Sequence, residues 1–177
     1  LEEALGAIAE AAELWQRVGR CERHLARLDL AAAAFEASAR DWQVLGEQVQ
    51  QAAAIHNQGQ VALARSHYDE AFGIFTRALA CATPTPDAAA PRDDLAQLHL
   101  DLARAHRGRG DLAAERRHAA LAQACAEAAP TRLVARSTLL VADVRAGLSG
   151  ALEALGPVLR ELEAAGLLLE ASEATAV

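Results

Sequence analysis

A sequence pattern that recurs at a fixed interval constrains the fold of this chain more than any other feature. Its first copy consists of Trp15, Val18, Gly19, Ala31 and Phe35. The same offsets return 40 residues later (59 − 19), at Ile55, Gln58, Gly59, Ala71 and Phe75, with the Gly, Ala and Phe identical. Two weaker copies follow, centred on Ala103 and Asp143. A fixed internal interval is typical of stacked repeat proteins, because each unit buries its apolar face only against its neighbours.

The composition predicts that the repeating units are helical. Hydrophobic residues make up 53% of the 177 residues and aromatic residues only 3%. Much of the apolar share is Ala, the residue with the highest helix propensity, and no β-branched, aromatic-rich run of strand length stands between turn signals. We therefore predict an all-α fold. The predicted helices cover residues 2–24, 28–44, 47–65, 68–81, 93–108, 111–128, 131–146 and 149–165.

The predicted helices group into four pairs within a single domain, 1–177. The pairs span about 2–44, 47–81, 93–128 and 131–165. A segment with three prolines, 82–91, is expected to form a loop between the second and third pairs, because proline cannot continue a helix. Residues 166–177 are expected to form a capping helix or the start of a further unit. Gly156-Pro157 is expected to interrupt or kink the last helix.

Charge and cysteine usage limit the classes of partner. The net charge of −7 argues against direct nucleic-acid binding, which needs a basic surface. No continuous apolar run is long enough for a transmembrane helix. The three cysteines show no C-x-x-C spacing, which favours reduced thiols and a cytoplasmic location. The chain starts inside a helical pattern, so we expect it to be part of a longer protein.

The repeated residues resemble tetratricopeptide repeats. In that family Trp or Leu, a Gly and a Tyr mark the first helix of a unit, and Ala-x3-Phe followed by Ala marks the second. The second unit matches best, at Ile55, Gly59, Tyr68, Ala71, Phe75 and Ala78. The first unit matches at Trp15, Gly19, Leu28, Ala31 and Phe35. The third and fourth are degenerate, with Glu115 and Asp143 at positions that are usually small.

The resemblance implies a fold and a general function. The fold would be an α-solenoid of antiparallel helix pairs in a right-handed superhelix. The interval of about 40 residues, rather than the usual 34, is similar to that of repeat arrays in bacterial regulatory and signalling proteins. The implied function is a non-enzymatic protein-binding or peptide-binding module, a scaffold within a larger protein. Two alternatives are a sensor domain for a small ligand or peptide pheromone, and a self-assembly module that forms homo-oligomers.

In this family the first helices of the units line the concave, ligand-binding face. The resemblance therefore implies a binding surface made of Gln16, Arg20, Arg23, His56, Gln60, Leu63, Leu100, Arg104 and Arg107. Two pairs of these arginines are spaced i, i+3 and share a helix face, which would suit an acidic peptide. The alternative is that the arginines pair with nearby acidic residues of the chain itself.

We expect no catalytic residue, cofactor or metal ion. His99 and His106 lie seven residues apart, and His118 falls on the next predicted helix, so none of these histidines has the i, i+4 spacing of a helical zinc site. Gly108-Arg109-Gly110-Asp111 is predicted to be a turn between helices rather than a phosphate-binding loop.

Overall fold

The computed structural model describes residues 2–83, 90–167 and 174, and these residues form eight α-helices and no β-strand. The predicted all-α fold is confirmed. The helices are α1 (Glu2–His24), α2 (Leu28–Leu45), α3 (Gln48–Ala64), α4 (Tyr68–Ala82), α5 (Arg92–Arg109), α6 (Leu112–Cys125), α7 (Ala129–Arg145) and α8 (Ala151–Ala164). The predicted helix ends are at most three residues away, at the end of α6 (128 against 125). No helix in the described ranges is long and apolar enough to cross a membrane.

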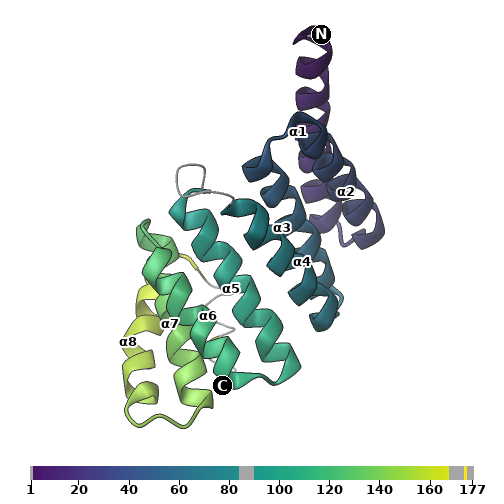
Figure 1. Cartoon of the computed structure of the whole chain (residues 1–177). Coiled ribbons are helices and arrows are strands. Elements are labelled where there is room, and N and C mark those ends of the chain that lie inside the picture. Colours follow the sequence, from purple (N-terminus) through teal and green to yellow (C-terminus); the bar gives the residue numbers. More distant parts are fainter. Residues whose placement is uncertain (1, 84–89, 168–173, 175–177) are drawn as a thin grey trace. The chain divides into compact units, whose positions relative to one another are not determined.

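The chain divides into two compact units, Leu1–Ala90 and Pro91–Val177. The first unit contains α1 to α4 and the second contains α5 to α8, and within each unit every helix packs against the next one along the chain (Figure 1). Most of the predicted proline-rich loop, 82–91, lies outside the described residues, and α4 already includes Ala82. The predicted capping segment, 166–177, also lies largely outside them.

The recurring Gly and Phe of the sequence pattern pack against each other within a helix pair. Phe35 of α2 lies against Gly19 of α1, and Phe75 of α4 lies against Gly59 of α3. A Cβ atom at Gly19 would lie 2.6 Å from the nearest ring atom of Phe35, and one at Gly59 would lie 2.3 Å from that of Phe75. Carbon atoms normally approach to about 3.5–4.0 Å. Only glycine therefore lets the two helices approach this closely around a phenyl ring.

The turns inside the helix pairs follow from local backbone chemistry. Gly110 ends α5 in the left-handed region, and Asp111 then caps α6 by accepting a hydrogen bond from the Ala114 amide at 3.0 Å. The turn between helices predicted at Gly108-Arg109-Gly110-Asp111 is confirmed at Gly110 and Asp111, which separate α5 from α6. Ala26 and Ser66 occupy equivalent turns, and both take positive φ values, 57° and 59°. The interval of 40 residues that separates the sequence repeats thus also separates two turns with the same backbone conformation (66 − 26).

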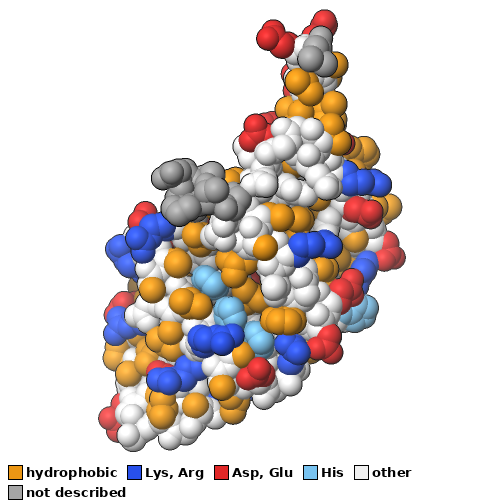
Figure 2. Space-filling model, viewed as in Figure 1, with side chains coloured by type: hydrophobic (Ala, Val, Ile, Leu, Met, Phe, Trp, Pro, Cys, Tyr) orange, Lys and Arg blue, Asp and Glu red, His pale blue; other side chains and the backbone are white. Residues whose placement is uncertain are grey.

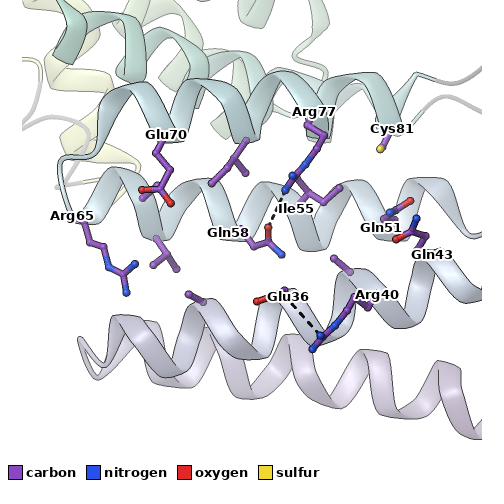
Figure 3. Close-up of a pocket in the computed structure, with 15 residues that line it drawn as sticks. Glu36, Arg40, Gln43, Gln51, Ile55, Gln58, Arg65, Glu70, Arg77 and Cys81 are labelled. Carbon is purple, nitrogen blue, oxygen red and sulfur yellow. Dashed lines mark hydrogen bonds and ion pairs between the residues drawn. The ribbon is translucent and has the colours of Figure 1, made fainter.

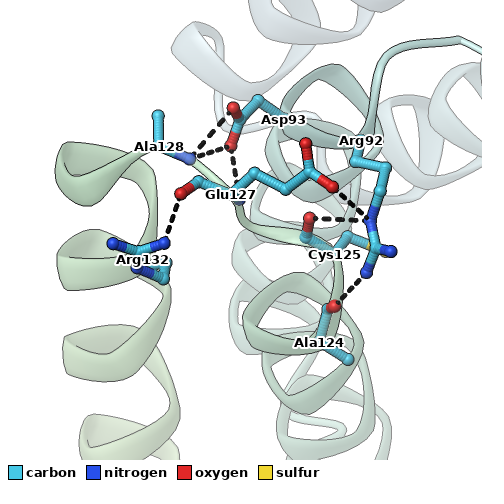
Figure 4. A network of polar contacts seen from close by, with 7 residues as sticks. All are labelled: Arg92, Asp93, Ala124, Cys125, Glu127, Ala128 and Arg132. Carbon is cyan, nitrogen blue, oxygen red and sulfur yellow. Dashed lines mark hydrogen bonds and ion pairs between the residues drawn. The ribbon is translucent and has the colours of Figure 1, made fainter.

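The connection between α6 and α7 is held by two charged residues at the start of α5 (Figure 4). Arg92 donates to the carbonyl oxygens of Ala124 (2.7 Å) and Cys125 (3.4 Å), the last carbonyls of α6. Asp93 accepts from the backbone amides of Glu127 (2.9 Å) and Ala128 (3.1 Å) at the start of α7. These donated hydrogen bonds lower the pKa of Asp93. One helix N-terminus therefore caps the ends of two other helices.

The core of the second unit combines apolar packing with two buried carboxylates, Asp101 and Glu115. Leu162 and Val158 of α8 are buried against Leu133 and Val134 of α7. Gly156-Pro157 does not end α8, which continues from Ala151 to Ala164. Glu115 of α6 is fully buried and forms ion pairs with Arg107 of α5 and Arg145 of α7, so it joins three helices.

Candidate partner-binding groove

A groove of about 550 Å³ in the first unit is formed by α2, α3 and α4 (Figure 3). Its apolar lining consists of small and branched side chains, Ala32, Ala39, Ile55, Val61, Ala62 and Ile74. Its polar lining consists of Glu36, Arg40, Gln43, Gln51, Gln58, Arg65, Glu70 and Arg77, together with Cys81. Polar and charged residues therefore outnumber the apolar ones in this lining.

The groove results from the way in which the three helices pack. Both α2 and α4 pack against α3, so the side of α3 that lies between them forms the bottom of the groove. Ala32 and Ala39 leave space along α2, whereas the longer side chains of Arg40 and Arg77 stand on the two sides. An alternation of Ala with long polar residues on α2 therefore creates the groove, and the sequence pattern around Gly19 and Gly59 does not reveal it.

The charged groups of the groove are held by weak interactions. Arg77 donates to the side-chain oxygen of Gln58 at 3.3 Å. Arg40 lies 3.9 Å from Glu36, with both side chains exposed. Arg65 forms an ion pair with Asp29 at the end of the groove. Exposed ion pairs contribute only about 0–1 kcal/mol, and the hydrogen bond of Arg77 to Gln58 is long. Arg40 and Arg77 can therefore exchange their partners for the carboxylates of a ligand at little cost.

A second groove, of about 380 Å³, occupies the equivalent place in the second unit. It lies among α6, α7 and α8 and is lined by Gln123, Ala129, Arg132, Leu133, Arg136 and Glu161. Arg136 and Glu161 stand 3.9 Å apart, both about half exposed. Each unit thus has an arginine-bearing groove between the second helix of one pair and the two helices of the next pair.

Three of the residues predicted to line a binding surface come together on a different side of the first unit. Arg23 of α1 donates to the side-chain oxygen of Gln60 of α3 at 2.5 Å, and Gln60 lies 3.5 Å from His56. Gln16 and Leu63 are half-buried, and Arg20 is exposed. None of these six residues lines the groove of α2, α3 and α4.

The three predicted site residues of α5 have contacts within the second unit. Leu100 is 1% exposed and packs in an apolar cluster with Ala122 and Ala135. Arg104 forms an ion pair with Asp101 at 2.9 Å, and Arg107 forms one with the buried Glu115 at 2.7 Å. In α5 the structure therefore has the arginines paired with acidic residues of the chain, the alternative that the sequence left open.

A cluster of three histidines lies between α5 and α6. The Nδ1 atoms of His99 and His118 are 3.1 Å apart, and the rings of His106 and His118 are stacked with centroids 5.3 Å apart. Burial lowers the pKa of all three, that of His118 to about 4. Their spacing in the sequence gave no signal of this contact. Among the described residues no group of His, Cys, Asp and Glu is arranged to hold a metal ion.

No protein-family model matches this chain, and no curated protein matches its sequence.

Proposed function

We propose that this chain is a non-enzymatic binding module that holds an acidic segment of a partner protein in the groove of α2, α3 and α4. In this proposal the helix pairs form a tetratricopeptide-like solenoid, and the module serves a larger cytoplasmic regulatory protein. The recurring contact between Gly and Phe supports the repeat architecture.

The observation that carries the proposal is the lining of the groove. The groove is lined by three arginines, Arg40, Arg65 and Arg77, and by only two glutamates. The groove is therefore locally basic, although the net charge of the chain is −7. Arginine suits carboxylate recognition because its planar guanidinium donates two parallel hydrogen bonds. A segment with acidic residues beside one or two apolar side chains matches both parts of this lining.

The groove is a better candidate than the surface implied by the family resemblance. Arg23 and Gln60 hydrogen bond to each other, Arg107 holds a buried carboxylate, and Leu100 belongs to the apolar core. A ligand on that surface would have to break these contacts. In the groove, the contacts of Arg40 and Arg77 are long and exposed.

The proposal is tested by selecting ligands from a displayed random-peptide library against the 177-residue chain, followed by titration of the selected peptides. We expect enrichment of acidic peptides and perturbation of the amide resonances of α2, α3 and α4. Arg77→Glu is expected to weaken binding by about tenfold or more, the effect of losing one charge-assisted contact and adding a repulsive one.

The matched control is Arg160→Glu, an exposed arginine of α8 that lies in neither groove. It makes the same change of net charge, so it should leave the affinity unchanged. Equal losses of affinity for the two variants would show that binding depends on net charge alone and would refute the proposed site. Selection of peptides that perturb only α1 and α5 would refute it as well.

A further inference from the structure

One side of α1 carries an apolar stripe that is exposed except at two half-buried residues, Ala11 and Val18. The stripe has alternating intervals of three and four residues over three heptads, and it consists of Ala4, Ala7, Ala11, Leu14, Val18, Cys21 and Leu25. Leu14 is 57% exposed, and Leu25, just after the helix, is 60% exposed. The buried residues of α1, Ala12 and Gly19, lie on the side that packs against α2. This heptad spacing is the pattern by which two helices form a coiled coil.

The internal repeat indicates that this side of a first helix is a packing surface. The residues of α3 that are equivalent to Leu14 and Cys21, 40 positions later, are Ala54 and Val61. Both are buried, and Val61 packs against Phe35 of the preceding α2. In α1 the same positions carry Leu14 and Cys21, and both side chains remain exposed. The stripe is therefore built like an interface between helices.

The charged residues that border the stripe identify the helix that fits it. At intervals of seven along one edge stand Glu3, Glu10, Arg17 and His24. Two copies of α1 in antiparallel orientation place Glu10 of each beside Arg17 of the other, and Glu3 beside His24. In parallel orientation the edge glutamates would instead lie beside Ile8 and Trp15. Arg17 now pairs with Glu13 at 3.6 Å with both side chains exposed, a contact that is weak enough to exchange.

We propose that two copies of this chain associate through an antiparallel coiled coil of their α1 helices. The first turns of α1 extend beyond α2, so a second helix can reach the stripe (Figure 1). Figure 2 shows hydrophobic side chains along this part of the helix and acidic side chains at its tip. In the register fixed by the charges, Leu14 of each copy packs beside Ala11 of the other, and Cys21 packs beside Ala4. This surface is separate from the groove proposed for the partner segment.

Sedimentation equilibrium of the full chain, from micromolar to millimolar concentration, tests the association. We expect a reversible dimer for the chain itself. Glu10→Arg and Arg17→Glu should each weaken the dimer several-fold, because each creates two repulsive pairs, and the double variant should recover the original affinity. Leu14→Glu should weaken dimerisation by about a hundredfold or more, because it places two carboxylates in the seam. Circular dichroism verifies that each variant remains folded.

Disulfide trapping tests the orientation independently. In a background with Cys81→Ala and Cys125→Ala, Ala4→Cys should give a covalent dimer with the native Cys21 of the other copy when oxidised glutathione is added. The same background without Ala4→Cys should not crosslink, because antiparallel pairing keeps the two Cys21 residues roughly 25 Å apart. A monomer at every concentration, a dimer insensitive to Leu14→Glu, or crosslinking through Cys21 alone would overturn the proposal.

Discussion

The substitution of Gly59 by Ala tests the contact on which the repeat pattern depends. In a helix, Ala is normally favoured over Gly by about 0.5–1 kcal/mol, because it loses less backbone entropy on folding. At Gly59, however, the added Cβ would lie 2.3, 2.6 and 2.8 Å from three ring atoms of Phe75. These distances are all shorter than the normal carbon contact of about 3.5–4.0 Å. The phenyl ring is 0% exposed, so its neighbours prevent it from moving aside.

The magnitude follows from these two opposing effects. Overpacking of a well-packed core costs about 1–3 kcal/mol, and an overlap of more than 1 Å with one of the ring atoms puts Gly59→Ala near the upper end. After the gain in helix propensity, we expect a net destabilisation of about 2 kcal/mol. Urea unfolding monitored by tryptophan fluorescence measures it, since Trp15 and Trp42 are the two tryptophans of the chain and both belong to the first unit.

Gly73→Ala is the matched control. Gly73 lies in α4, is exposed, and has nothing within 4 Å of an added Cβ, so the same substitution should stabilise the unit by about 0.5–1 kcal/mol. The double variant Gly59→Ala with Phe75→Leu should be more stable than the sum of the single changes predicts, because the smaller side chain relieves the overlap. If Gly59→Ala were neutral or as stabilising as Gly73→Ala, the proposed reason for the recurring glycine would be refuted.

Three further substitutions or conditions test the core and the buried charges. Phe75→Ala should destabilise the first unit by about 3–5 kcal/mol in the same fluorescence assay, and an unchanged unfolding curve would contradict the repeat register. Arg107→Gln should destabilise the second unit by about 2–3 kcal/mol in thermal unfolding, because it removes the closest ion partner of the fully buried Glu115; Arg160→Gln, on an exposed site, should change it by less than about 0.5 kcal/mol. The lowered pKa of His118, about 4 against 6.5 unfolded, means that the folded state binds fewer protons, so stability should fall by up to about 3 kcal/mol as the pH drops through this range. His118→Gln should flatten that part of the pH profile, and an equal slope in the variant would contradict the assignment.

The sequence could predict the helices because each one is marked by local chemistry. Gly110 and Asp111 end one helix and begin the next through their own backbone and side-chain hydrogen bonds. The recurrence of Gly59 and Phe75 at fixed offsets could be recognised in the sequence, but their contact inside one helix pair was seen only in the structure. Features of this kind depend on residues that are near in sequence or repeated in register.

The charged contacts of the second unit could not be predicted in the same way. Arg107 and Arg145 meet on Glu115 from two other helices, and Glu115 occupies a position at which the repeat pattern has a small residue. Which acidic group an arginine reaches depends on the rotation of each helix about its axis. That rotation is set by packing, and the degenerate third and fourth units gave the least information about it.

The groove was missed for a related reason, and the reason bears on how repeat proteins acquire partners. The repeat pattern records the positions that must be small or large for helices to stack, and Gly59 and Phe75 are such positions. The pattern positions Ile55 and Gln58 contribute to the groove, but its arginines on α2 and α4, Arg40 and Arg77, lie outside the pattern. The arginines proposed to bind a partner are therefore not among the positions that the repeat pattern records. A resemblance carried by the stacking residues alone can suggest the fold, whereas the ligand has to be inferred from the side chains between them.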